Sequence, residues 1–164
     1  MIEAKLHGLQ SYGIEQQANY LLDGDFLRNS GYQGGKRFVQ MADPPTAIFA
    51  TNDYMALGAY QAILEENFRI PEEVALIGFN DIEFTAMKGI ELTTIGQKKF
   101  EMGAIAVKTL VEKIEGEEVR PSTKEIILKP ELIVRKTCGF HLRGYQLNGL
   151  DRKLEGPGIG YRSF

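Results

Sequence analysis

The sequence predicts an α/β fold built on a parallel sheet, and three observations carry this prediction. Two short apolar runs each lead into an asparagine followed by an aspartate: residues 47–50 precede Asn52-Asp53, and residues 74–78 precede Asn80-Asp81. The segment between them, residues 54–66, has the length of a crossover helix, which parallel strands require. Strand, helix and strand together occupy about thirty residues, the size of a βαβ unit.

The first forty residues predict a helix, a strand and a second helix. Residues 3–12 carry apolar side chains one turn apart, and Gly13 would end that helix. Residues 20–22 are typical of a short strand that is closed by a polar turn. Asp25 is placed to cap a helix that continues to Met41. Three glycines within this helix indicate close packing or a bend: Gly31, Gly34 and Gly35.

The central helix has clear start and stop signals. Asp53 can cap its first turn, because a carboxylate accepts hydrogen bonds from free backbone N–H groups. Asn67 is the tolerated non-glycine choice for a left-handed residue after the last turn, and Phe68 can fold back on that turn. Pro71 prevents any extension of the helix.

The second half of the chain predicts one extended segment, one long helix and two returning strands. Residues 92–95 are extended, and residues 126–128 and 132–134 are strand candidates that Pro130 separates. The helix at residues 99–115 carries an apolar stripe at steps of three and four: Phe100, Gly103, Ala104, Val107, Leu110, Val111 and Ile114. Its five larger side chains need a partner, so we expect self-association.

Bulk composition fits one globular domain and excludes several functional classes. The chain has 164 residues, 43% of them hydrophobic and 25% charged, which is typical of globular proteins. A formal charge of -3 gives no general attraction to a phosphate backbone, so we expect no nucleic-acid contact by this chain alone. No apolar run approaches the roughly 18 residues that span a membrane. We expect a cytoplasmic protein.

The sequence carries no recognisable catalytic, cofactor or metal motif, so we expect a non-enzymatic protein. The stretch Gly34-Gly35-Lys36-Arg37 lacks the first glycine and the final Ser or Thr of a phosphate-binding loop. His7 and His141 are isolated, without a second ligand at metal spacing. No serine lies in a Gly-x-Ser-x-Gly elbow.

Five motifs follow one another in the order found in a known family: Pro45-Thr-Ala-Ile-Phe-Ala-Thr-Asn-Asp-Tyr-Met-Ala-Leu-Gly-Ala59, Ile70-Pro71-Glu-Glu-Val-Ala-Leu-Ile-Gly-Phe-Asn-Asp81, Leu92-Thr-Thr-Ile95, Met102-Gly103 and Leu132-Ile-Val-Arg135. Together they closely resemble the effector-binding domain of bacterial lactose-repressor and galactose-repressor type regulators. Weaker agreement at Lys5-x-x-Gly8-Leu9 and Gly24-Asp25-Phe26 extends the resemblance over residues 3–137.

The resemblance implies a periplasmic-binding-protein-like (type I) fold in which two α/β subdomains are hinged by three crossovers. Residues 1–92 would form the carboxy-terminal type of subdomain. Residues 93–123 would be a crossover and an orphaned helix of the incomplete other subdomain, and residues 124–138 would return as strands. Residues 139–164 would be a glycine-rich, poorly ordered tail. The DNA-binding headpiece and most of the amino-terminal subdomain would be missing.

Carried over position by position, the resemblance implies a set of ligand-binding residues. Asn52 resembles the family's pocket amide, and Asn80 stands where an aspartate usually accepts hydrogen bonds from ligand hydroxyls. Phe26 resembles the aromatic residue that stacks on a sugar or base. Lys5 stands at the place of a pocket arginine, and Gln97 follows the crossover from which some members reach the ligand.

Each of these positions also has an ordinary structural interpretation. Asp53 either caps the following helix or touches the ligand, and the two asparagines could also be caps. Two departures from the family pattern weaken the transfer of function: Lys5 lacks the bidentate fork of arginine, and Asn80 offers one acceptor oxygen and two donor hydrogens. The resemblance further implies a dimer interface that includes Met55 and Leu57.

The leading hypothesis is the effector-binding, dimer-forming core of a transcriptional regulator that senses a sugar or nucleobase by closing a cleft. Two alternatives stay open on the sequence. The chain could be an extracytoplasmic solute-binding protein for uptake or chemotaxis, which shares the fold. It could also be a fragment that only folds and associates.

Overall fold

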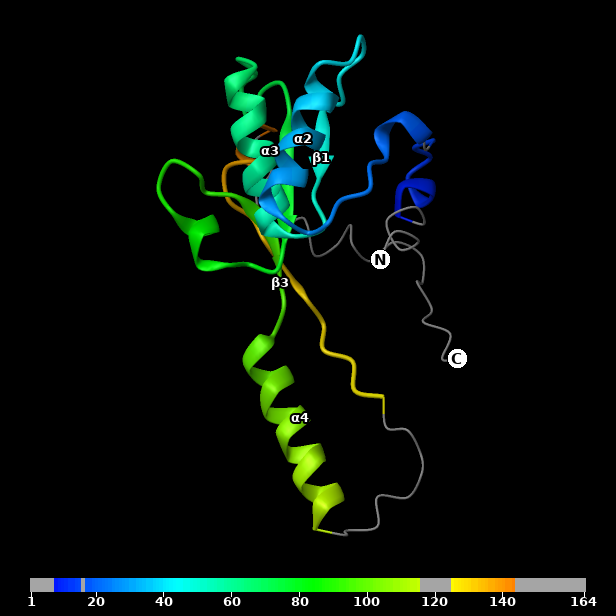
Figure 1. The fold of residues 1–164 in the computed structure, drawn as a ribbon, viewed down its shortest axis with the longest axis vertical. Coiled ribbons are helices and arrows are strands. Elements are labelled where there is room, and N and C mark those ends of the chain that lie inside the picture. The colour runs from blue at the N-terminus through cyan, green and yellow to red at the C-terminus, as the bar shows by residue number, and fades with distance from the viewer. Residues whose placement is uncertain (1–7, 16, 116–124, 144–164) are drawn as a thin grey trace.

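The computed structural model describes residues 8–15, 17–115 and 125–143 and consists of an α/β body with one projecting helix (Figure 1). In chain order its elements are η1 (Ala18–Tyr20), α2 (Arg28–Val39), β1 (Ala47–Phe49), α3 (Asp53–Glu65), β2 (Ala75–Phe79), η2 (Glu83–Ala86), β3 (Thr93–Gly96), α4 (Lys99–Ile114), β4 (Glu131–Ile133) and η3 (Phe140–Arg143). This is the α/β, mostly parallel fold that the sequence predicts.

The described strands form one sheet in the order β1-β2-β3-β4. The first three strands run parallel, and β4 returns antiparallel to β3. The pair β1 and β2 is joined by α3, so the predicted βαβ unit is confirmed. The register aligns Phe49 with Ile77, and this register fixes which residues meet beyond the ends of the two strands.

The core lies between the sheet and the helix pair α2 and α3, which pack against each other. Ile63, Leu76 and Leu92 are among its fully buried side chains. The two helices touch backbone to backbone: a Cβ at Gly31 would collide with the backbone of Met55. The sequence expectation that this glycine serves close packing is therefore confirmed.

The N-cap of α3 is the neighbour of the residue that the sequence predicts, whereas the end of the helix is as predicted. Asn52 is the N-cap, because its Oδ1 accepts a hydrogen bond from the Met55 backbone N–H at 2.8 Å. The expectation that Asp53 caps this helix is wrong, since the carboxylate of Asp53 turns into the protein. At the other end Asn67 has φ +63°, and the Phe68 N–H bonds to the Ile63 carbonyl at 3.1 Å, so that prediction is confirmed.

Two predicted strands are absent from the described part of the chain. Residues 20–22 pair with no described strand, since the Tyr20 and Leu21 N–H groups close turns onto the Gln17 and Ala18 carbonyls at 3.1 and 3.2 Å. Residues 126–128 have no strand beside them, because β3 leaves the sheet at Gly96. The return is therefore made by β4 alone.

The three other predicted helices also have definite outcomes. Residues 8–11 are helical and Gly13, at φ +69°, ends that turn as predicted. The helix predicted to follow the Asp25 turn is present as α2 but is shorter than the expected one. The helix α4 extends away from the body and has no buried residue, which confirms the expected orphaned helix (Figure 1).

Candidate ligand-binding site

The carboxyl ends of β1 and β2 form the polar edge of the sheet. Asn52 and Asn80 each lie three residues beyond the register pair Phe49 and Ile77, so the register brings both asparagines to the same edge. In open parallel sheets this edge is where ligands bind. The predicted convergence of the two residues on one rim is thus a consequence of strand pairing.

Asn52 organises one side of this edge by holding Phe26. Its Nδ2 donates to the Phe26 carbonyl at 2.8 Å, while its Oδ1 is occupied by the helix-capping bond. The Phe26 backbone is left-handed, with φ +65°, and its side chain is 56% exposed. A left-handed non-glycine residue is costly, so the Asn52 bond helps to hold it there. The result is an aromatic ring presented at the edge.

Asn80 organises the other side together with Gln97. The Asn80 Nδ2 donates to Gln97 Oε1 at 3.4 Å, and its backbone N–H donates to the Ile95 carbonyl at 2.9 Å. Within the described residues the Oδ1 of Asn80 accepts no hydrogen bond, so one acceptor is available at the rim. The structure therefore joins four of the predicted residues in two hydrogen-bonded pairs that the sequence did not predict, Asn52 with Phe26 and Asn80 with Gln97.

Asp53 lies beneath this edge and bonds to the protein. Its side chain is fully buried, Oδ1 accepts from the Thr94 hydroxyl at 2.6 Å, and Oδ2 accepts from the Ile82 N–H at 2.9 Å. Burial raises the pKa of Asp53 above its ordinary value, against the lowering effect of these two bonds. Asp53 thus fixes the loop after β2 to the start of α3 and to β3.

A second, partly buried polar group, which lies in one of the sequence motifs but is not assigned to the site by the sequence, ties the same edge to the crossover strands. The Arg135 guanidinium forms an ion pair with Asp81 at 2.7 Å and donates to the Thr85 hydroxyl at 3.1 Å and the Leu92 carbonyl at 2.8 Å. Lys99 Nζ, at the start of α4, donates to the Asp81 carbonyl at 3.0 Å. The residue after Asn80 therefore connects the edge to both the outgoing and the returning segments.

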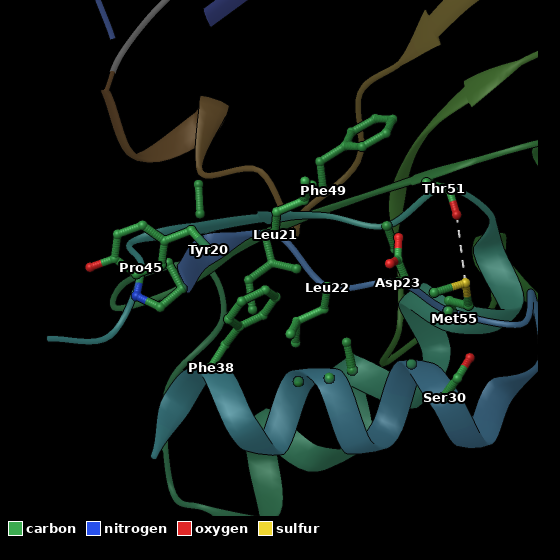
Figure 2. A pocket seen from close by; sticks show the side chains of 18 of the residues that line it. Tyr20, Leu21, Leu22, Asp23, Ser30, Phe38, Pro45, Phe49, Thr51 and Met55 are labelled. Atoms are coloured by element: carbon green, nitrogen blue, oxygen red, sulfur yellow. Dashed lines mark hydrogen bonds between the residues drawn. The ribbon is translucent and has the colours of Figure 1, made fainter. Parts of the chain in front are cut away.

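A cavity of about 580 Å³ adjoins the edge on the side of Phe26 and lies between residues 20–24, α2 and β1 (Figure 2). Polar groups and one thioether gather at the end nearest the edge: Asp23, Ser30, Thr51 and Met55. The far end is apolar and aromatic: Tyr20, Phe38 and Pro45. Of the three glycines of α2, Gly34 faces Leu22 across this space, whereas Gly31 and Gly35 lie against α3.

The remaining predicted residues have different outcomes. Lys5 lies outside the described residues, so its predicted role is untested. Met55 lines the cavity, and its Sδ lies 3.6 Å from the Thr51 hydroxyl, so its side chain faces into the chain (Figure 2). Leu57 is partly exposed, and its neighbour Tyr54 is exposed.

The described ranges 8–15, 17–115 and 125–143 contain neither a candidate metal site nor a helix that could span a membrane. In these ranges no three His, Cys, Asp or Glu side chains cluster in a way that could hold a metal ion. Across the same residues, every helix is too short or too polar to cross a bilayer.

Comparison with known proteins gives a consistent result in sequence and in structure. Residues 3–138 match the family described as periplasmic binding protein-like domain. The chain is 35% identical over 132 residues to the HTH-type transcriptional repressor PurR of Mannheimia succiniciproducens, which covers 80% of this chain and 39% of that protein.

Solved structures agree with this match. A transcriptional regulator CelR in complex with cellobiose superposes with a TM-score of 0.77 at 27% identity, over 83% of this chain and 41% of that one. A regulatory protein of the LacI family from Chloroflexus aggregans superposes with a TM-score of 0.76 at 30% identity, over 84% and 49%. The chain thus spans less than half the length of each of these relatives.

Proposed function

Because this chain belongs to the periplasmic-binding-protein-like family, in the branch of LacI-type transcriptional regulators, we propose that it is the ligand-sensing core of a cytoplasmic transcriptional regulator. It binds a small polar effector, a sugar or a nucleobase, and carries out no catalysis. DNA is contacted only through a separate headpiece. The regulator names of its relatives favour this role over a solute-binding protein for uptake.

The observation that carries the proposal is the strand register that brings Asn52 and Asn80 to one edge. The Oδ1 of Asn80 accepts a hydrogen bond from the effector, and Gln97 orients the Asn80 amide through their shared bond. The exposed ring of Phe26 stacks on the flat face of the effector, held in place by Asn52. Lys5 adds a positive charge to the same site.

Asp53 acts indirectly in this proposal. Its buried carboxylate receives the Ile82 N–H and the Thr94 hydroxyl, so it sets the position of the loop that carries Asn80. Removing it changes the geometry of the rim without removing a direct contact to the effector.

The edge is only one wall of a complete site. A ligand pocket usually buries most of the surface of a small ligand, whereas Phe26 is more than half exposed. We therefore expect this chain alone to bind its effector weakly, and a second wall to close over the ligand in the active regulator. Closure would shift the population between an open and a closed form.

The proposed dimer interface lies on the outer face of α3 and the loop that contains η2. Leu57 is the predicted interface residue that does not line the cavity. Tyr54 on α3 is exposed, and so are Phe84 and Met87 in the loop that contains η2. Met55 supports this face from inside the chain, because its side chain lines the cavity beneath α3. Aromatic residues and methionine are enriched at protein interfaces.

The test is an NMR titration of the purified chain with a panel of mono- and disaccharides, nucleobases and nucleosides. We expect one compound class to shift the amide signals of Phe26, Asn80 and Gln97, with weak affinity. Asn80→Ala should abolish these shifts, because it removes the free acceptor at the rim.

The matched control is Asn29→Ala, an exposed asparagine on α2, which should leave the titration unchanged. Shifts confined to residues away from the edge would contradict the proposal. A flat response to every compound would leave only a fragment that folds and associates.

A further inference from the structure

The two residues that follow β2, Asn80 and Asp81, have a strained backbone. Both have a positive φ, +108° for Asn80 and +49° for Asp81. Residues other than glycine rarely adopt this conformation, and it persists only where the surrounding structure holds it. The strain lies at the rim that carries the Asn80 amide, so the contacts that maintain the strain also set the position of that amide.

The outgoing segment, residues 97–99, leads from β3 into α4 (Figure 1) and contacts both strained residues. Gln97 Oε1 accepts a hydrogen bond from Asn80 Nδ2 at 3.4 Å, and Lys99 Nζ donates to the Asp81 carbonyl at 3.0 Å. Lys99 is also the first residue of α4. A change in the orientation of α4 therefore acts directly on the Asp81 carbonyl.

Arg135 lies just after β4, on the segment that returns from α4, and contacts the side chain of the same Asp81. Its guanidinium donates to Asp81 Oδ1 at 2.7 Å, and the Arg135 side chain is only 19% exposed. A hydrogen bond between two charged groups is strong where water is largely excluded. The carboxylate of Asp81 is thus tied to the returning segment, while its carbonyl is tied to the outgoing one.

The body of the protein holds the neighbours of Asp81 more closely than Asp81 itself. The Asn80 N–H is bonded to β3 at 2.9 Å, and the Ile82 N–H is bonded to the buried Asp53 carboxylate at 2.9 Å. The contacts of Asp81 with the body, to two threonine hydroxyls, are longer, at 3.4 Å each. Because the Asn80 nitrogen is fixed, a displacement of Asp81 is accommodated by rotation about the Asn80 N–Cα bond, which turns the Asn80 side chain.

We propose that Lys99 and Arg135 are positioning residues for the effector site, which act through Asp81 and couple the conformation of Asn80 to the orientation of α4. The inference rests on the proposed function in one respect, that Asn80 is the residue that meets the effector. An effector that fixes the Asn80 amide then favours one orientation of α4. By linkage, the orientation of α4 changes the affinity for the effector by the same factor.

The first test follows the Asn80 side-chain amide by NMR in the purified chain without any added compound. Lys99→Met removes the donor to the Asp81 carbonyl from an exposed position. We expect it to shift the Asn80 side-chain resonances and to leave the circular dichroism of the fold unchanged. The matched control is Lys98→Met, which removes exposed ion pairs with Glu101 and Glu131 and no contact to Asp81. This control should leave the Asn80 resonances in place.

Arg135→Met applies the same test to the returning segment. It removes the donor to Asp81 Oδ1 and should also shift the Asn80 resonances. The neighbouring Lys136→Met, which removes the ion pair with Glu91, should not shift them. A merely structural role for Arg135 would lower the midpoint of unfolding and leave the Asn80 resonances where they are, and that result would overturn the proposal.

The second test measures the coupling in the opposite direction. Residual dipolar couplings of backbone amides report the orientation of α4 relative to the strands. Asn80→Gly relieves the strain at the rim, because glycine accepts a positive φ without steric cost, and should change the couplings of α4. The matched control is Asn67→Gly, which replaces another asparagine with positive φ, at the end of α3. It should leave the couplings of α4 unchanged.

Two outcomes of these tests contradict the proposal. The first is an Asn80 signal that responds to Lys98→Met as strongly as to Lys99→Met, and the second is an orientation of α4 that Asn80→Gly does not change. Both tests are made without an effector, so they are independent of the titration that tests the proposed function. A titration that is flat for every compound would remove the effector from the site and leave the coupling between Asn80 and α4 to be judged by its own tests.

Discussion

The helices α3 and α4 have similar lengths and similar apolar content, yet α3 packs into the core and α4 is exposed to solvent along its length. Six residues of α3 are buried, among them Ala56, Ala59 and Ile63, whereas α4 has no buried residue. The sequence predicts both segments as helices, α3 from its length and its start and stop signals and α4 from its apolar periodicity. The contrast teaches that periodicity predicts a helix and its apolar face, but the surrounding chain decides whether that face is covered.

The first prediction tests this difference in burial with one glycine that packs against α3 and one glycine on α4. Gly31→Ala should destabilise the protein by about 2 kcal/mol, because the new Cβ meets the backbone of Met55 and overpacking outweighs the gain in helix propensity. Gly103→Ala should instead stabilise α4 by up to about 1 kcal/mol, since open space surrounds it.

Urea unfolding of both variants, each compared with the wild type, measures these differences. Equal effects at the two glycines would mean that the two helices lie in similar environments, and the contrast would fail.

The second prediction concerns the ion pair between Arg135 and Asp81. The Asp81 carbonyl also accepts a hydrogen bond from Lys99 at the start of α4. Arg135→Met should cost about 2 kcal/mol, because it leaves the half-buried Asp81 without its partner and removes donors to Thr85 and Leu92. The neighbouring Lys136→Met removes an ion pair in which the carboxylate of Glu91 is as buried as that of Asp81 but the ammonium is exposed, 68% against 19% for Arg135, so it should change stability by less than about 0.5 kcal/mol.

Thermal unfolding monitored by circular dichroism compares these two variants with the wild type. A loss for Lys136→Met as large as that for Arg135→Met would show that burial does not set the value of these pairs.

The third and smallest prediction is a pH dependence that resides in the body. The pKa of Asp53 is raised in the folded protein, so the stability that Asp53 contributes is complete below its ordinary pKa of 3.8. That contribution is lost as the pH rises through the raised pKa. Glu91 responds in the opposite direction, because the hydrogen bond from Lys136 lowers the pKa of Glu91.

Denaturant unfolding of wild type and Asp53→Asn between pH 3.5 and about 7, the range that spans ordinary and raised carboxyl pKa values, isolates this effect. We expect the stability of the wild type relative to the variant to fall as the pH rises. A relative stability that grows with pH would show that the hydrogen bonds from Thr94 and Ile82 outweigh the cost of burial.

The successes and failures of the sequence predictions separate according to the range of the interactions involved. The βαβ unit, the end of α3 at Asn67 and the extent of α4 depend on residues close in sequence, and the structure has all three. The strand at residues 20–22 depends on pairing with a distant partner, and it did not form. The sequence could not tell which of the neighbours Asn52 and Asp53 caps α3. Only the side-chain geometry shows that Asn52 is the cap and that Asp53 bonds to Ile82.

The candidate site follows the same division. The placement of Asn52 and Asn80 after two strands could be predicted, because parallel strands share a carboxyl edge. The bonds that orient these amides could not, since Phe26 lies 26 residues from Asn52 and Gln97 lies 17 residues from Asn80. The cavity beside α2 was also beyond the sequence, because it arises where three separate segments meet.

By itself the sequence determined the elements, their order and the polar edge of the sheet, because periodicity, caps and turns act over a few residues. Only the tertiary structure decided that Asp53 is buried and that Arg135 joins the edge to both crossovers, because those contacts connect residues 29 to 54 positions apart. It also decided that no described segment buries the apolar side chains of α4. A side chain's burial depends on what the rest of the chain places beside it, and no local pattern contains that information.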